Sequence, residues 1–466
     1  MREGLTFDDV LLVPQYSEVA SRSGVDTTTW LTPQIRLAIP IVASNMDTVC
    51  ESEMAIAMAR LGGIGIIHRF LSIEEQVTEV RNVKDADNIV ILSPYTIDKS
   101  GKASEARDVM IEKNISSLLV VDTAHLIGII TLKTLTLEPL NGDLVTEFMT
   151  PVGEMITASP SINIEEAKEI MRANRVGKLP LIENGLLRGL ITRKDIIDME
   201  QYPMATKDSK GRLRCGAAIG VGIDCVERAE ALIQSGVDVI VVDIAHGHSF
   251  NCIRVIHLLK NKYGKDIQII AGNVATLEGA KALSKVGADA IKVGVGPGSI
   301  CTTRIVTGHG VPQLTAIMDC NQIDVPIIAD GGIQTSGDIV KAIAAGANTV
   351  MLGSLLAGTE ESPGEFIHRN GQRCKVVRGM ASYGAALGRE SRNGDAISSS
   401  TPEGVEGIVP YRGYTHEVIG NLIGGVRSGM SYSGVFVIKE LQERGEFIKI
   451  TQAGRTESQP HDIQPV

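Results

Sequence analysis

Eight short runs of apolar, mostly β-branched residues recur along the chain, and most of them end in Gly, Asp or Asn. The runs are 39–44, 63–68, 215–220, 237–243, 267–273, 288–294, 325–330 and 348–354. Amphipathic stretches such as 227–236 and 277–287 separate most of them. Continuous apolar strands that alternate with helical segments are typical of parallel sheets buried on both faces. The pattern predicts an α/β protein with a (β/α)₈ TIM barrel; an open doubly wound sheet is the alternative, but it does not require eight units.

An internal repeat lies between the second and third runs. Residues 103–131 and 164–192 align at a constant offset of 61, and each copy predicts a helix followed by two apolar strands. The pattern resembles a tandem pair of CBS domains over 93–200. It therefore predicts a barrel in two parts, 1–92 and 201–466, with this pair inserted in one loop. CBS pairs often bind adenine or guanine nucleotides, so the resemblance implies ATP or GTP as a ligand; a purely structural pair is the alternative.

Composition and charge narrow the class of protein. Of 466 residues, 43% are hydrophobic and 21% are charged, which is ordinary for a folded protein. A net charge of −10 and only 3% aromatic residues disfavour a nucleic-acid partner. No apolar run reaches the ~20 residues of a membrane span, and the N-terminus lacks a signal-peptide pattern. Seven scattered cysteines without a C-x-x-C motif favour a reduced, cytoplasmic compartment.

The loop after the sixth run carries the sharpest chemical signal, because active sites of TIM barrels lie at the carboxyl ends of the strands. Within ten residues the loop holds Gly294, Gly296, Gly298, Ser299, Cys301, Thr302 and Thr303. Clustered glycines allow close approach of the backbone to a ligand, and exposed carbonyls could hold a monovalent cation. The cysteine is a candidate nucleophile; a glycine-rich turn with an incidental cysteine is the alternative.

Other strand ends suggest ligand contacts. Asp330-Gly331-Gly332 and Gly353-Ser354 follow the seventh and eighth runs, where barrels often bind phosphate, although turn residues alone would look the same. Asp243 and Asn273 end the fourth and fifth runs and could contact a cofactor or cap helices. His246 and His248 are assigned no metal, because no third ligand is placed near them. Residues 384–401 are polar and without periodicity, which predicts a mobile flap.

Several motifs identify a family. They are GLTFDDVLLVP (4–14), GPGSICTTR (296–304), IIADGGI (327–333), MLGSLLAGTEESPGE (351–365), RGMAS (378–382) and PEGVEGIVPYRG (402–413). Together they resemble the IMP dehydrogenase/GMP reductase family over the whole chain. The resemblance implies a TIM-barrel oxidoreductase that forms homotetramers or octamers. It also implies a cysteine that attacks C2 of a purine nucleotide to form a covalent intermediate.

The resemblance assigns roles to residues of this chain. Cys301 would be the nucleophile, with Thr303 taking part in catalysis. The nucleotide would bind at Ser299, Asp330, Gly332, Gly353, Ser354, Gly379 and Met380, with Glu403 facing the edge of the base. Asp243 and Asn273 would line the side of the nicotinamide cofactor. A potassium ion, where present, would bind carbonyls of Gly296, Gly298 and Cys301.

The two activities of the family run in opposite directions. The dehydrogenase oxidises IMP to XMP with NAD and needs an Arg-Tyr pair in its flap, which 383–401 lacks. We therefore favour a reductase that converts GMP to IMP and ammonia with NADPH in purine interconversion and salvage; Asn45 and Thr307-Gly308 also resemble reductases. The usual reductase acid falls at Tyr383, so the nearest flap acid, Glu390, is the candidate. The CBS insertion and the GTEESPGE motif resemble dehydrogenases, so IMP dehydrogenase stays the alternative function. A non-catalytic sensor of purine nucleotides is a more remote alternative.

Overall fold

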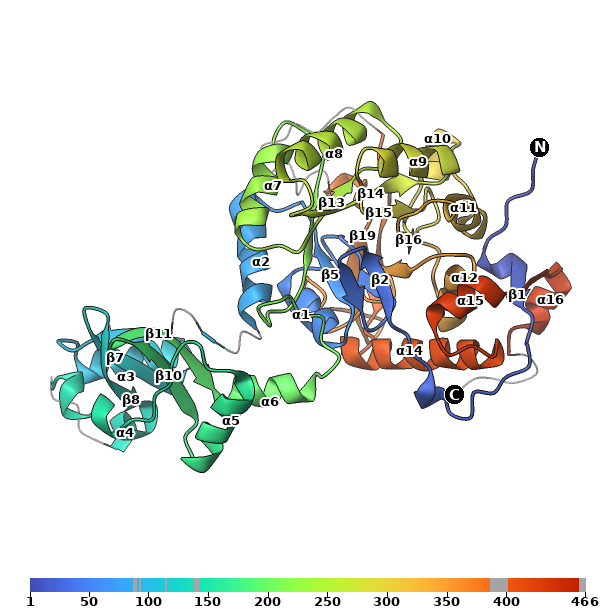
Figure 1. Ribbon diagram of the computed structural model, residues 1–466. Helices are drawn as coiled ribbons and strands as arrows, with labels where there is room; N and C mark the ends of the chain where they lie inside the picture. The colour runs from blue at the N-terminus through green and yellow to red at the C-terminus, as the bar shows by residue number, and fades with distance from the viewer. Residues whose placement is uncertain (87–89, 92–93, 114, 138–142, 386–400, 461–466) are drawn as a thin grey trace. The chain divides into compact units, whose positions relative to one another are not determined.

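The computed structural model describes residues 1–86, 90–91, 94–113, 115–137, 143–385 and 401–460. The chain forms two compact units (Figure 1). The first unit joins Met1–Ala86 to Met204–Val466, and the second is Asp87–Pro203. The predicted insertion, 93–200, lies inside the second unit.

Eight parallel strands of the first unit close into a barrel (Figure 1). They are β4 (Ile41–Ala43), β5 (Ile64–Ile67), β12 (Gly216–Ile219), β13 (Val239–Asp243), β14 (Gln268–Val274), β15 (Ala290–Val293), β16 (Ile327–Asp330) and β17 (Thr349–Leu352). Each strand overlaps one of the eight apolar runs, and β17 pairs with β4 to complete the ring. The predicted TIM barrel is confirmed, and the open sheet is excluded because the order of strands is closed.

Helices surround the barrel, as the amphipathic stretches predict. They are α1 (Ser52–Arg60), α2 (Ile73–Ala86), α7 (Cys225–Gln234), α8 (Phe250–Tyr263), α9 (Leu277–Lys285), α11 (Gln313–Cys320), α12 (Ser336–Ala344) and α14 (Thr415–Tyr432). Alternate strand residues face inward and outward. Val42, Ile66 and Val241 belong to the inner apolar cluster, whereas Ala43, Ile67 and Val242 pack in the cluster that includes the helices. A hairpin of β2 (Thr29–Thr32) and β3 (Ile35–Leu37) adds Leu31 and Leu37 to the inner cluster.

Elements outside the eightfold pattern complete the first unit. A three-stranded antiparallel sheet follows the barrel: β18 (Ile367–Arg369), β19 (Gln372–Arg378) and β20 (Glu406–Pro410). A short helix, α10 (Thr303–Thr307), follows the loop after β15. Near the ends of the chain, β1 (Val10–Leu12) pairs with β21 (Phe447–Lys449), beside α15 (Ile438–Arg444) and α16 (Gln452–Glu457). The sheet and α10 both matter for the site, because they flank the loop that carries Cys301.

The second unit is built from two copies of one motif. The first copy is α3 (Ala103–Glu112), β7 (Ser117–Asp122), β8 (His125–Thr131) and α4 (Leu132–Leu137). The second is α5 (Ile164–Ala173), β10 (Lys178–Glu183), β11 (Leu186–Thr192) and α6 (Arg193–Gln201). Every element of the second copy begins 61 residues after its counterpart, so the sequence repeat is a structural repeat. The strands form one sheet with β6 (Thr96–Asp98) and β9 (Thr150–Pro151). That this unit is a nucleotide-binding CBS pair stays a prediction.

Within the described ranges of both units, no helix is long and apolar enough to cross a lipid bilayer.

Candidate active site

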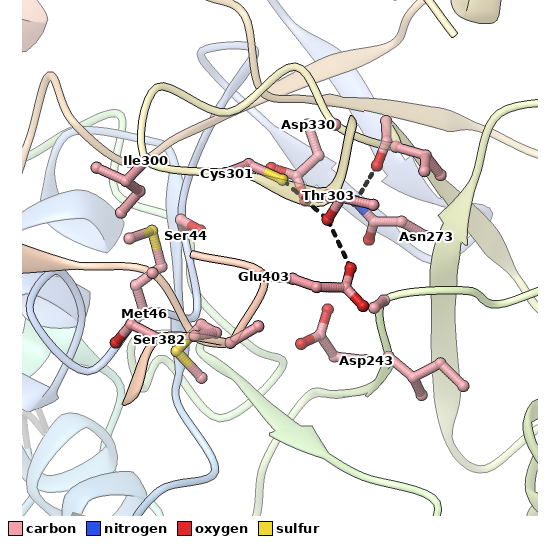
Figure 2. Close-up of a pocket in the computed structure, with 18 of the residues that line it drawn as sticks. Ser44, Met46, Asp243, Asn273, Ile300, Cys301, Thr303, Asp330, Ser382 and Glu403 are labelled. Atoms are coloured by element: carbon pink, nitrogen blue, oxygen red, sulfur yellow. Dashed lines mark hydrogen bonds between the residues drawn. The ribbon is translucent and has the colours of Figure 1, made fainter. Parts of the chain in front are cut away.

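A cavity of about 470 Å³ lies at the carboxyl ends of the barrel strands (Figure 2). Its walls come from the loops after β4, β5, β13, β14, β15 and β16, together with residues that adjoin β19 and β20. Nine of the predicted site residues line it: Asp243, Asn273, Gly296, Cys301, Thr303, Asp330, Gly379, Met380 and Glu403. The closed barrel therefore gathers on one face residues that are up to 160 positions apart in the sequence.

The cysteine is joined to a carboxylate through a hydroxyl group (Figure 2). The Cys301 thiol donates to Thr303 Oγ1 over 3.2 Å, and the Thr303 hydroxyl donates to Glu403 Oε2 over 2.8 Å. Thr303 is the first residue of α10, so the loop and the helix start present both side chains together. The arrangement offers the thiol proton a route to a carboxylate.

Backbone hydrogen bonds hold Glu403 in this place. The Thr302 N–H donates to the Glu403 carbonyl over 3.0 Å, and the Val405 N–H donates to the Ile300 carbonyl over 3.0 Å. Cys301 and Gly404 thus face each other as an isolated antiparallel bridge. The register of this bridge decides which acid meets Thr303. Glu390, the acid predicted from the sequence, lies outside the described residues, as do positions 386–400 of the predicted flap.

A buried lysine that the sequence analysis missed lies between two predicted ligand-binding carboxylates. Lys292 Nζ is 2.7 Å from Asp243 Oδ1 and 2.8 Å from Asp330 Oδ2, and only 4% of its side chain is exposed. Burial acts to lower the pKa of Lys292, but the two aspartates outweigh it and raise that pKa above its usual value. Burial acts to raise the pKa of Asp243, but Lys292, helped by Arg69 and Asn45, lowers it below its usual value.

A signal for Lys292 was present in the sequence. It is the one charged residue inside the sixth apolar run after its opening Ala-Asp, and a lysine on a doubly buried strand requires a counter-charge. Asp243 and Asp330, at the ends of the fourth and seventh runs, were the available counter-charges.

Asn273 is oriented by both of its amide hydrogens. Its Nδ2 donates to the Gly294 carbonyl over 2.7 Å and to Asp330 Oδ2 over 2.9 Å. These bonds run to the loop after β15 and to the end of β16 rather than to a helix N-terminus, so Asn273 does not act as a helix cap here. The side chain links the Asp330 carboxylate to the loop that carries Cys301.

The predicted phosphate-binding segments lie in two places beside the cavity. Gly331 and Gly332 have positive φ angles of 93° and 81°, and a Cβ on Gly331 would come within 2.9 Å of Pro297. The Asp330–Gly332 turn therefore packs against the glycine-rich loop that contains Gly298 and Ser299. A Cβ on Gly353, which precedes Ser354, would lie 3.0 Å from Met46 Sδ, and Met46 lines the cavity. Five of the predicted residues do not line the cavity itself: Gly298, Ser299, Gly332, Gly353 and Ser354.

An ion pair that sequence reasoning did not single out fixes the segment with Gly379 and Met380. Arg378 Nε and Nη2 lie 2.7 and 2.5 Å from Asp47 Oδ2, and the Arg378 N–H donates to Thr48 Oγ1. Asp47 follows the first barrel strand, β4, and its side chain is 5% exposed. The RGMAS motif contained the arginine, but its partner is more than 300 residues away.

The proposed cation site remains a prediction. The Gly298 carbonyl accepts a hydrogen bond from the Cys301 N–H over 3.1 Å, so this loop closes a turn of its own. In the part of the chain that the structure describes, no group of three or more His, Cys, Asp or Glu side chains could hold a metal ion. The rings of His246 and His248 lie edge to face, 6.4 Å apart.

Comparison with known proteins gives matches along the whole chain. Residues 4–461 match the family described as the IMP dehydrogenase / GMP reductase domain. Inosine-5'-monophosphate dehydrogenase of Nitrosopumilus maritimus (strain SCM1) is 51% identical over 474 residues, which covers 99% of each chain. GMP reductase of Leishmania major is 49% identical over 479 residues, which covers 99% of this chain and 97% of the relative.

A solved structure extends the likeness to three dimensions. A cysteine-to-alanine variant of GMP reductase from Trypanosoma brucei, in complex with guanosine 5'-monophosphate, superimposes with a TM-score of 0.94 at 47% identity. The match covers 100% of this chain and 99% of that chain. Relatives of both names are oxidoreductases and match the chain almost equally well. Barrel, site and comparisons agree: the chain belongs to the IMP dehydrogenase/GMP reductase family of oxidoreductases.

Proposed function

We propose that the protein reduces GMP to IMP and ammonia with NADPH, through a covalent intermediate on Cys301, in purine nucleotide interconversion and salvage. The hydrogen-bonded chain Cys301–Thr303–Glu403 carries the proposal, because the leaving amine at C2 needs a proton donor close to the nucleophile. Binding of guanosine 5'-monophosphate by the similar Trypanosoma brucei enzyme supports GMP as the substrate.

The reaction divides into two halves at this site. Cys301 gives its proton through Thr303 to Glu403, and the sulfur forms a bond to C2 of the guanine base. The C2–N bond then breaks, and the amine takes a proton back along the same chain to leave as ammonia. NADPH, held beside Asp243 and Asn273, would supply a hydride to C2. The C–S bond breaks with return of its electron pair to sulfur, which gives IMP and a Cys301 thiolate, and uptake of one proton from water restores the thiol.

The residues around the cavity divide between two ligands. For the nucleotide we propose Ser299, Asp330, Gly332, Gly353, Ser354, Gly379 and Met380. For the nicotinamide side we propose Asp243 and Asn273, which line the same cavity as Cys301. The Asp243 carboxylate and the Asn273 amide suit a carboxamide group and ribose hydroxyls. Glu403 is the acid that the hydrogen bonds favour, and Glu390 stays a second candidate.

Oxidation of IMP to XMP with NAD is the second candidate function. The 51% identity to an enzyme named inosine-5'-monophosphate dehydrogenase favours it. It would need a group that deprotonates water, and Arg389 or Arg392 would be the candidates from the predicted flap.

One pair of assays separates the two functions. The purified protein is given GMP with NADPH, and separately IMP with NAD, and absorbance at 340 nm is followed with parallel detection of ammonia and XMP. We expect NADPH consumption matched by ammonia release, and little reduction of NAD. Rapid formation of XMP from IMP, without GMP-dependent loss of NADPH, would reverse the assignment.

Other proposals follow from the family resemblance. We propose a homotetramer or octamer in the cytoplasm, and ATP or GTP as a ligand of the unit Asp87–Pro203. We also propose potassium at the carbonyls of Gly296, Gly298 and Cys301. If potassium binds there, turnover in potassium salts should exceed turnover in lithium salts at equal ionic strength.

A further inference from the structure

Lys292 lies in the barrel opposite a glycine, whose missing side chain leaves room for it. It lies on β15, with Gly272 of β14 and Ile328 of β16 as its neighbours in register. A Cβ on Gly272 would come within 2.6 Å of Lys292 Cβ. The missing side chain of Gly272 therefore makes room for the lysine stem, which runs up the barrel interior to the cavity. A buried cation placed in this way needs partners to offset the loss of hydration.

Both partners are carboxylates at the mouth of the barrel, one on each side of β15. Asp243 ends β13 and Asp330 ends β16, and one ammonium group reaches both within 2.8 Å (Figure 2 shows the two aspartates in the cavity wall). Asp330 is also held by Asn273, and Asp243 by Asn45. No other described lysine lines this cavity.

We propose that Lys292 is a positioning residue for the hydride-transfer reaction: its ammonium holds Asp330, on the nucleotide side, and Asp243, on the cofactor side, in one shared arrangement. This inference rests on the proposed assignment of those two aspartates, but not on the direction of the reaction. A single cation then sets both ligand sites, so its loss should disturb nucleotide and cofactor together. It also lowers the pKa of Asp243 and so favours the ionised carboxylate there.

The charged and polar groups that face this cluster come from several elements. Asp243, Asn273 and Asp330 come from strand ends β13, β14 and β16, Asn45 follows β4, and Arg69 follows β5. Among the described residues, Lys292 is the cation that lowers the pKa of Asp243 most, and Arg69 contributes less. Without Lys292, Asp243 would therefore take up a proton at a higher pH than in the wild type.

The test compares Lys292→Met with the wild type in whichever direction the wild type turns over. Methionine keeps the length of the stem and removes the charge. We expect KM to rise for both ligands and kcat/KM to fall by about 10²-fold, as for loss of a preorganised charge in an active site. We also expect the acidic limb of the profile of kcat/KM against pH to move to higher pH.

A matched control exists elsewhere in the barrel unit. Lys84 of α2 is 2% exposed and also bridges two aspartates, Asp208 at 3.3 Å and Asp238 at 2.5 Å, but it does not line the cavity. Lys84→Met removes the same kind of buried charge. It should lower the thermal midpoint without changing either KM or the shape of the pH profile, which separates positioning from general loss of stability.

A second variant keeps the proposal testable if Lys292→Met does not fold. Lys292→Arg keeps the charge but changes its shape. We expect it to retain the wild-type pH profile and to raise both KM values together. Wild-type KM values in the arginine variant, a rise in only one of them, or an unshifted acidic limb in Lys292→Met would each overturn the inference.

The single variants Asp330→Asn and Asp243→Asn test the assignments on which the inference rests. The first should raise KM mainly for the nucleotide, and the second mainly for the cofactor. If these two results fail, the proposed site assignment is wrong; if they hold and Lys292→Met affects only one ligand, the positioning role is wrong.

Discussion

At the scale of single residues, Cys301 is half-buried and opens into the cavity, whereas the six other cysteines are buried. We predict that Cys301→Ser abolishes turnover and leaves GMP binding largely intact, because a neutral hydroxyl is a far weaker nucleophile than a thiolate and serine keeps the loop. Steady-state rates and calorimetric titration with GMP measure the two effects. Cys320→Ala, in the buried face of α11, is the control that should keep its activity. Near-native rates in Cys301→Ser would exclude the covalent mechanism.

The proton route through Thr303 makes a separate prediction. Thr303→Val keeps the shape of the side chain but cannot pass a proton, and Glu403→Gln removes the terminal acid. Each should lower kcat by ~10²–10⁴-fold. Since the two groups act in series, the double variant should be little worse than either single variant. Independent losses that multiply in the double variant would show that the hydrogen-bonded chain is not a relay.

At the scale of elements, the ion pair between Arg378 and Asp47 ties the end of β19 to the loop after β4. Arg378→Met should raise KM for the nucleotide about tenfold, since a hydrogen bond to a charged group contributes ~1.5 kcal/mol, while kcat changes little. The adjacent residues Gly379 and Met380 would lose their support in this variant. Arg373→Met is a control on the same strand, because Arg373 stacks on Phe366 and Tyr411 and does not line the cavity. An equal rise of KM in the control would argue against a specific role for the ion pair.

At the scale of the whole molecule, the barrel unit contains all eight barrel strands without the segment Asp87–Pro203. The chain ends on the two sides of that segment are held close to each other, since Lys84 contacts Asp208. We predict that replacing 87–203 by a short Gly-Ser linker leaves a folded enzyme with near-native kcat. Circular dichroism, thermal melting and the 340 nm assay measure this. Any response of the full chain to ATP or GTP should vanish. An insoluble product would show that the barrel depends on the second unit.

Much of this architecture could be predicted from local patterns. The eight apolar runs became the eight strands, and the offset of 61 between repeats reappears as two copies of one motif. The glycine-rich loop that the sequence singled out carries Cys301 and Thr303, and both residues line the cavity. These features can be predicted from the sequence because strand burial, helix amphipathicity and turn formation depend on residues close together in the chain.

Closure of the barrel determined which distant side chains meet in the site. The carboxylate that accepts from Thr303 is 100 residues away, and it was selected by a backbone register between Ile300–Thr302 and Glu403–Val405. In the sequence, Lys292 is one residue of an apolar strand. Only the closed barrel shows that Asp243 and Asp330 lie on either side of its ammonium group. Sequence by itself determined which segments are strands and which loop carries the candidate nucleophile, because those depend on local composition. Only the tertiary structure decided which charges neutralise one another, because electrostatic pairing depends on distance in space and the closed sheet sets that distance.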